Sequence, residues 1–201
     1  MVVAYRQANY GTPLRTEPAR APGRYHTGTE PSPTQYLCLH PLGPLAEFMR
    51  RNAFRTEEQL RATRLRTWAL RVEDDGLEEI GFHDAGGYGI DPAALVDDEV
   101  TECQRLAAAV RPTGSPGIIV PSAALPGAQN VVLFGPRVGS PYLLEPLGEV
   151  DVPESVTAED GRPIAGLLER VRFRGDPHPA LEAWHRGDEY VFEEPDWSFP
   201  A

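Results

Sequence analysis

The chain has 201 residues, enough for one domain with a sizeable core, and its apolar (41%) and charged (24%) fractions are those of a globular protein. The net charge of -11 opposes the phosphate neutralisation on which nucleic-acid affinity rests, so DNA, RNA and anionic membranes are poor partners. All 19 basic residues are arginine, which excludes a Walker-type phosphate loop, a Schiff-base lysine and a lysine general base.

Cysteine and histidine usage bounds the chemistry further. Cys38 and Cys103 lie far apart and without metal-ligand spacing, which predicts two buried, reduced thiols and neither a disulfide framework nor a zinc site. The five histidines are scattered, so no metal site is expected. No apolar run approaches the roughly 18 residues of a membrane span, and we expect a cytoplasmic protein.

The first half of the chain predicts a strand, a long loop and a strand–turn–helix unit. Met1 to Tyr5 is a short apolar strand, and Thr12 to Pro33, rich in Pro, Gly, Arg and Thr, is an irregular loop. Thr34 to His40 alternates as a strand does. Pro44 then suits the first turn of a helix over Leu45 to Asn52.

The middle of the chain mixes helices with one strand. Thr56 to Thr63 is charged and predicts a short helix, and Leu65 to Val72 alternates as a half-exposed strand. The Asp91-Pro92 pair predicts a helix start over Ala93 to Val96. Asp98 is expected to cap a second helix through Arg105 to Val110.

The most buried-looking segments follow. Gly117 to Val120 and Asn130 to Phe134 predict core strands, Leu167 to Phe173 a strand or the end of a helix, and Pro179 to His185 a helix. Strands and helices alternate irregularly, which favours an α+β fold: a single domain with a small mixed or antiparallel sheet and flanking helices. We expect a catalytic domain over residues 1–140 and a C-terminal extension, 141–201, packed on it.

Two arginines are candidate anion ligands. Arg6 closes the first strand, and Arg24 lies in the Pro-Gly-Arg-Tyr-His stretch of the long loop, so both project from positions where they can clamp a pyrophosphate. For any single arginine in such a chain, a solvated or surface-paired side chain is the competing interpretation.

A tyrosine, a glutamate and a serine complete the candidate set. Tyr36 lies within the predicted strand, and Glu47 follows eleven residues later in the helix among apolar neighbours, where a carboxylate must be paired or functional. An exposed first-turn acid favoured by the helix dipole explains Glu47 equally well. Ser122 follows Gly-Ile-Ile-Val-Pro, and its simplest role is a helix N-cap or a turn residue.

In their order along the chain, these residues resemble the landmarks of the RES-domain family, which is named for its Arg, Glu and Ser motif residues. The resemblance covers about Val3 to Phe134. The family's usual Gly-Gly-Arg-Trp-Asn is replaced here by Pro-Gly-Arg-Tyr-His. The matching landmarks are Tyr5-Arg6, Gly23-Arg24-Tyr25, Tyr36, Ala46-Glu47, and Gly-Ile-Ile-Val-Pro-Ser ahead of Asn-Val-Val-Leu-Phe.

The resemblance implies a fold similar to that of ADP-ribosylating toxins, a role as the toxin of a toxin–antitoxin pair, and attack on the nicotinamide–ribose bond of NAD. NAD is then a substrate, no cofactor is expected, and water, inorganic phosphate or a protein side chain is left open as the acceptor. Such a bond breaks through an oxocarbenium-like ribose, so a site needs anchored phosphates, an oriented ring and a carboxylate near the developing charge.

The resemblance also distributes the roles. Glu47, Arg6 and Tyr36 are the expected catalytic residues, with Glu47 at the ribose and Tyr36 stacked against a ring. Arg6 and Arg24 are expected to hold the pyrophosphate or an attacking phosphate, beside Tyr25, and Ser122 to donate a positioning hydrogen bond.

The expected partner is a cognate antitoxin with a helix-turn-helix (Xre-like) domain that blocks the site; the oligomeric state is left open. Two alternatives to NAD cleavage by a glycohydrolase or phosphorylase remain: an ADP-ribosyltransferase that modifies a protein target, and a non-catalytic NAD-binding module.

Overall fold

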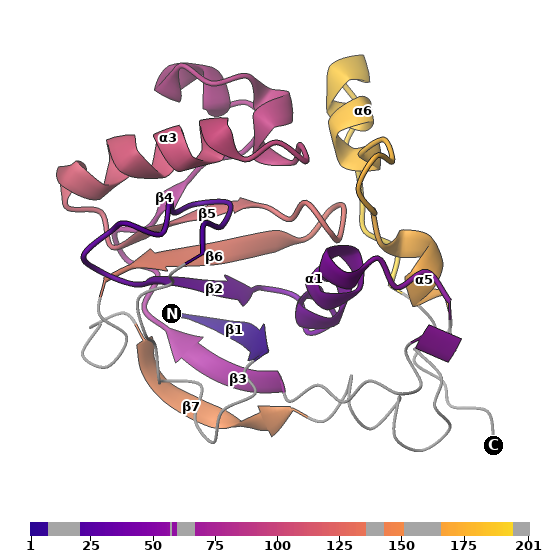
Figure 1. Cartoon of the computed structure of the whole chain (residues 1–201), viewed down its shortest axis with the longest axis horizontal. Coiled ribbons are helices and arrows are strands. Elements are labelled where there is room, and N and C mark those ends of the chain that lie inside the picture. The colour runs from indigo at the N-terminus through magenta and orange to yellow at the C-terminus, as the bar shows by residue number, and fades with distance from the viewer. Residues whose placement is uncertain (8–20, 57, 60–66, 136–142, 151–165, 195–201) are drawn as a thin grey trace.

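A single twisted sheet organises the protein. The computed structural model describes residues 1–7, 21–56, 58–59, 67–135, 143–150 and 166–194 (Figure 1). Seven strands lie in the order β4-β5-β6-β2-β1-β3-β7, with β4 parallel to β5 and every other neighbouring pair antiparallel. Their bounds are β1 Val2–Gln7, β2 Thr34–Cys38, β3 Thr67–Val72, β4 Glu78–Glu79, β5 Gly117–Pro121, β6 Gln129–Phe134 and β7 Leu143–Val150.

The helices lie in two groups (Figure 1). The helix α3 runs along the β4–β6 half of the sheet, whereas α1 lies at the end of β2 and α5 and α6 lie farther toward the same side of the view. The helical bounds are α1 Gly43–Asn52, α3 Thr101–Val110, α5 Leu167–Arg170 and α6 Pro179–Arg186, with 3-10 turns at η1 Ala85–Tyr88, η2 Pro92–Leu95 and η3 Arg111–Thr113. The predicted single-domain α+β fold with a mixed sheet is confirmed.

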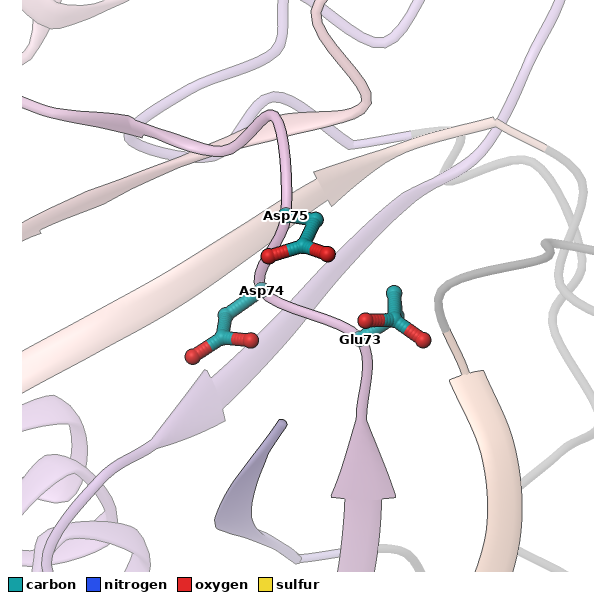
Figure 2. Close-up of side chains that lie close together, drawn as sticks. All are labelled: Glu73, Asp74 and Asp75. Carbon is teal, nitrogen blue, oxygen red and sulfur yellow. The ribbon is translucent and has the colours of Figure 1, made fainter.

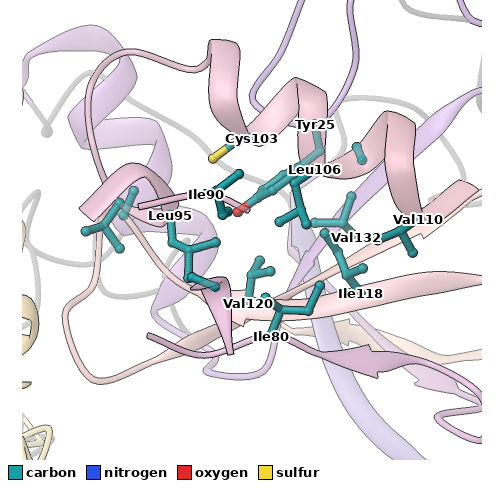
Figure 3. Close-up of a cluster of buried hydrophobic side chains, with 14 residues drawn as sticks. Tyr25, Ile80, Ile90, Leu95, Cys103, Leu106, Val110, Ile118, Val120 and Val132 are labelled. Atoms are coloured by element: carbon teal, nitrogen blue, oxygen red, sulfur yellow. The ribbon is translucent and has the colours of Figure 1, made fainter. Parts of the chain in front are cut away.

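Strand alternation divides the side chains between two faces of the sheet. Cys38 is paired with Tyr5 on β1 and with Asn130 on β6, so these side chains share one face with Tyr36, two residues earlier on β2. We call this the α3 face, because the core beneath α3 packs on it (Figure 3). The opposite face carries a second cluster of buried apolar side chains: Ala4, Leu37, Leu70, Val72, Val131 and Leu133.

The turn between β5 and β6 is buried against other elements. Ala124 and Leu125 pack against Leu45 and Met49 of α1 and, on the other side, against Phe173 of the C-terminal segment. The backbone amide of Arg172 donates to the carbonyl of Ala124 at 2.9 Å, which fixes this contact at the level of the main chain. One end of the hairpin is therefore held between α1 and residues 167–173.

Most of the predicted elements are found, and the differences have physical causes. The segment after Leu167 forms the short helix α5, and the Asp91-Pro92 start produces the 3-10 turn η2, with Asp91 Oδ1 accepting the amide of Ala93 at 2.8 Å. The helix expected at 56–63 lies largely outside the described residues. Both cysteines are buried and free, as predicted. No helix within the described ranges combines the length and apolar character needed to cross a bilayer.

The predicted cap at Asp98 is wrong. The helix α3 begins at Thr101 after Val100, without a side-chain cap on its N-terminal residue, and Glu99 rather than Asp98 accepts the amide of Thr101 at 3.1 Å. The carboxylate of Asp98 is instead engaged by two arginines and a backbone amide from distant parts of the chain. Two arginines and a backbone amide satisfy this carboxylate more fully than a single N-cap bond would, so the long-range partners are preferred.

Candidate active site

The helix α1 begins close to β2, and this close approach places Glu47 against the α3 face. A Cβ at Gly43 would lie 2.4 Å from the Cβ of Cys38, so only glycine lets the helix begin this close to β2. Glu47 follows one turn later and is half-buried. Its Oε1 accepts hydrogen bonds from Asn130 Nδ2 at 3.1 Å and from Ser122 Oγ at 3.4 Å. Glu47 is therefore a paired carboxylate and not an exposed first-turn acid.

Ser122 is the turn residue that the sequence predicts, and its hydroxyl also reaches Glu47. The side chain is only 1% exposed, and Oγ accepts the amides of Ala124 at 3.3 Å and Leu125 at 3.1 Å. Because these amides occupy the acceptor sites of the hydroxyl, its own proton is available for Glu47. Turn geometry thus determines where the hydroxyl proton points.

Asn130, which sequence reasoning missed, is the third member of this group. It begins the Asn-Val-Val-Leu-Phe strand opposite Cys38, and its amide nitrogen binds Glu47. Its Oδ1 is buried without a hydrogen-bond partner in the described part of the chain. A polar residue at the start of an otherwise apolar core strand was the available signal.

Tyr36 is fixed by its hydroxyl. Its Oη accepts the backbone amide of Tyr25 at 2.8 Å and lies 2.8 Å from His26 Nδ1. The other ring nitrogen of His26 faces the carbonyl of Ala21 at 3.0 Å, so a neutral ring carries its proton there and Nδ1 accepts from Tyr36. His26, which replaces the family's Asn, therefore completes the bonding of the tyrosine hydroxyl.

Gly23 permits this arrangement because a Cβ there would lie 2.3 Å from His26 Cε1. The Gly-Arg-Tyr-His stretch is consequently folded tightly over Tyr36, with backbone hydrogen bonds between Gly23 and His26.

Arg24 points away from that turn toward the loop after η2. Its Nη2 donates to the carbonyl of Asp97 at 2.6 Å, and its Nη1 lies 3.5 Å from the carbonyl of Leu95. The guanidinium is close enough to Tyr36 and Glu47 for its charge to act on both. Arg24, Tyr36, Glu47 and Ser122 therefore belong to one neighbourhood.

Two of the predicted site residues lie elsewhere. Arg6 follows Tyr5 on β1 and therefore projects to the face opposite Glu47, where its Nη1 donates to Gln35 Oε1 at 3.0 Å. Tyr25 is 2% exposed and lies in the core among Ile90, Leu106 and Cys103 (Figure 3). Arg6 therefore lies on the face opposite Glu47 and Tyr25 is buried beside Tyr36, and the contacts with NAD expected for both stay predictions.

Sequence reasoning did not foresee a charged cluster centred on Asp98. Asp98 Oδ1 accepts from Arg50 Nη2 at 2.5 Å and from Arg172 Nη1 at 2.6 Å, and its Oδ2 accepts the amide of Gly175 at 2.7 Å. Although burial opposes it, the hydrogen bond from Gly175 and the charges of the two arginines lower the pKa of Asp98. Arg50 and Arg172 are 7% and 9% exposed. This ion cluster, in which the arginines are buried and Asp98 is partly exposed, joins α1, the loop that holds Arg24, and the C-terminal segment.

A cavity of about 240 Å³ adjoins the hairpin formed by β5 and β6. It is lined by residues on both sides of the turn that contains Ser122 and by aromatic rings of α6 and its surroundings, among them Phe82, His178, Trp184 and Tyr190. A second cavity of about 300 Å³ lies at η2 and the start of α3 and is lined by Asp91, Ala93, Ala94, Asp97, Glu99 and Glu102. The first is largely apolar in its side chains and the second is acidic.

Among the described residues, one group of carboxylates comes within metal-binding distance. It consists of Glu73, Asp74 and Asp75, just after β3 (Figure 2). They are partly exposed, and Asp74 forms an ion pair with the amino group of Met1. No histidine or cysteine joins them in this group. Exposed carboxylates of this kind are accounted for by solvation and the ion pair, and we assign them no role in the site.

With this geometry established, the family is clear: the sequence profile of the RES domain matches residues 3–146, and the protein belongs to that family. A protein of Mycobacterium tuberculosis (strain ATCC 25618 / H37Rv) named "Probable NAD(+) phosphorylase Rv3189" is 31% identical over 118 residues. The aligned region is 59% of this chain and 56% of that protein, so the chain spans little more than half the length of its relative.

A solved structure shares the fold. A chain in the crystal structure of the M. tuberculosis MbcT-MbcA toxin-antitoxin complex superposes with a TM-score of 0.57 at 18% sequence identity. The similarity covers 74% of this chain and 84% of the other. The sequence profile shows the family, and the solved structure shows that the fold is shared over most of the chain.

Proposed function

We propose that this protein breaks the nicotinamide–ribose bond of NAD, as a glycohydrolase or phosphorylase. The observation that carries the proposal is the Glu47 carboxylate, held by Ser122 and Asn130 within reach of the charge of Arg24. A fixed carboxylate stabilises the positive charge that develops on the ribose as nicotinamide leaves. Membership of the RES domain family and the relative named as a probable NAD(+) phosphorylase support the same reaction.

The geometry suggests a division of labour. Glu47 Oε1 accepts both hydrogen bonds, so we assign Oε2 to the ribose hydroxyls and the developing cation. Arg24, anchored to the carbonyl of Asp97, supplies positive charge for a phosphate group. The hydroxyl of Tyr36 is already bonded to the Tyr25 amide and to His26, so we assign its ring to stacking against nicotinamide or adenine. Arg6 has no part in this scheme.

The test is direct incubation of the purified protein with NAD, with and without inorganic phosphate, followed by chromatography of nicotinamide and of the sugar product. We expect nicotinamide release. ADP-ribose as product identifies water as the acceptor, and ADP-ribose 1″-phosphate identifies phosphate. Absence of nicotinamide release from both mixtures contradicts the proposal.

The matched variants are Glu47→Gln and Glu182→Gln. The first retains the shape of the side chain but removes its charge, and we expect a loss of kcat of roughly 100-fold or more. Glu182 is an exposed residue of α6, and its neutralisation should leave the rate unchanged. A mass increment on other proteins in a lysate, without free ADP-ribose, would instead identify protein ADP-ribosylation.

We also propose a cytoplasmic antitoxin partner that binds near the site through a basic segment. The protein has a net charge of -11, and the acidic cavity at Asp91 to Glu102 adjoins Asp97, whose carbonyl binds Arg24. Support comes from the shared fold with a chain of a toxin-antitoxin complex. Expression alone should arrest growth and lower cellular NAD, and co-expression of the neighbouring gene should restore both.

A further inference from the structure

His178 forms a hydrogen-bonded link between α6 and the turn that contains Ser122. The ring is 4% exposed and lies at the N-terminus of α6, where Nδ1 accepts the amide of Leu181 at 3.3 Å. Its Nε2 lies 3.1 Å from the backbone carbonyl of Ser122. Since a neutral imidazole has one donor and one acceptor, Nε2 carries the proton and donates to Ser122.

The surroundings keep this ring neutral. Burial, together with the charges of Arg172, Arg50 and Arg24, lowers the pKa of His178 to about 4. At neutral pH the ring therefore has a single donor, and its only hydrogen atom on nitrogen points at the carbonyl of Ser122.

The same C-terminal segment holds the hairpin at a second point. The amide of Arg172 donates to Ala124, two residues beyond Ser122, while its guanidinium binds Asp98 and the carbonyl of Val96 at 3.2 Å. Residues 172–178 thus bind the turn at two carbonyls. They lie outside the 3–146 region that matches the family. Two bonds to backbone carbonyls, at Ser122 and at Ala124, therefore hold the main chain of the turn.

We propose that His178 is a positioning residue, which fixes the Ser122 peptide so that the serine hydroxyl donates to Glu47. The inference rests on the proposed function, since the reaction gives Glu47 its role. A competing role is purely structural, because the same ring accepts the Leu181 amide and so caps α6.

Two substitutions separate these roles. In His178→Asn the side-chain oxygen stands at the position of Nδ1 and can cap α6, but the side chain is too short to reach Ser122. In His178→Gln the amide nitrogen stands at the position of Nε2 and can donate to Ser122, but Gln is a poor cap. We expect Asn to lower kcat roughly 10-fold or more with KM little changed, and Gln to retain activity at a lower melting temperature.

A purely structural role predicts the reverse order, with the Asn variant active and the Gln variant impaired, and that result would overturn the proposal. A readout independent of turnover is the side-chain amide resonance of Asn130, which donates to the same Glu47 oxygen. It should shift in the Asn variant and not in the Gln variant. If the unsubstituted protein releases no nicotinamide, the proposed function fails, and the Asn130 resonance still decides the role of His178.

One measurement needs no substitution. Nitrogen-15 NMR of the unsubstituted protein identifies which ring nitrogen of His178 is protonated. Protonation at Nε2, with scalar coupling across the hydrogen bond to the Ser122 carbonyl, is the expected result. Protonation at Nδ1 would exclude donation to Ser122 and overturn the proposal even if both variants fail to fold.

Discussion

Ser122 Oγ lies 3.4 Å from Glu47 Oε1 while it accepts the amides of Ala124 and Leu125. A single hydroxyl thus closes a turn and orients a carboxylate that comes from a helix 75 residues earlier. Because the two interactions share one atom, on the proposed function we expect stability and catalysis to be coupled at this position, and substitution should reveal both.

Ser122→Ala should lower the free energy of unfolding by about 1 to 2 kcal/mol, since the turn amides lose their acceptor and Glu47 loses a donor. We expect kcat to fall about 10-fold as well, because the carboxylate then keeps only its hydrogen bond from Asn130. Urea unfolding and nicotinamide release measure the two effects. Ser115→Ala is the control: its hydroxyl bonds the carbonyl of Gly117 at 2.7 Å at the other end of β5, so stability alone should change. A rate loss shared by both variants would contradict the role of Ser122.

Asn130→Asp should shift the pH dependence of the reaction. The substitution places a second carboxylate beside Glu47, where the amide nitrogen now lies 3.1 Å from Oε1, and two neighbouring carboxylates cannot both ionise freely. The acidic limb of the kcat/KM profile should therefore move to higher pH, as a property of the coupled pair. Asn52→Asp adds the same charge at the exposed end of α1 and should leave the profile in place. Identical profiles for the two variants would exclude Asn130 from the site.

Tyr36→Phe removes the acceptor of the Tyr25 amide and the donor to His26 while it keeps the ring. A buried amide without a partner costs about 1 to 3 kcal/mol, so the melting temperature should fall. The KM for NAD should stay close to that of the parent protein, because stacking needs only the ring. Tyr36→Leu should raise KM as well. If the Phe variant has the higher KM of the two, the hydroxyl and not the ring binds substrate.

Stability should decrease between pH 6.5 and pH 4 through His178. Its pKa is about 4 in the folded protein, against 6.5 for an unperturbed histidine, so in this window the unfolded chain binds a proton that the folded protein does not. Protonation thus favours unfolding as the pH falls, by about 3 kcal/mol across the whole window. Asp98, whose pKa is lowered below 3.8, loses its ion pairs only at lower pH. Chemical unfolding at several pH values should show this slope, and His178→Gln should flatten it; an equal slope in both proteins would assign it to other groups.

Hydrophobic patterns and helix-start signals in the sequence predicted the strands and the helix start that depend on neighbouring residues. The strands at Thr34, Gly117 and Asn130 were visible because apolar side chains must cover the core, and Pro44 marked the start of α1. The strand β7 was missed because Pro146 and Gly148 resemble loop residues. It lies at the edge of the sheet, with shifted register on β3, where proline is tolerated.

The site could be predicted only in part because its contacts span the chain. Periodicity left Glu47 equally consistent with an exposed acid, since its partners lie 75 and 83 residues away. Asp98 was wrongly predicted to cap a helix because its arginine partners are 48 and 74 residues away in the sequence, beyond any local pattern. Motif order placed Arg24 and Tyr25 together, whereas their side chains diverge, one to the loop after η2 and the other into the core.

The link from His178 to Ser122 has a consequence during biosynthesis. A nascent chain that has emerged from the ribosome as far as β6 already contains Glu47, Ser122 and Asn130, but neither Arg172 nor His178. Domains begin to fold as they are synthesised, so the sheet can form while the turn is still unrestrained. On the proposed function, such a chain already has Glu47 and its donors beside an unrestrained turn, so we expect full activity only once translation has passed residue 178.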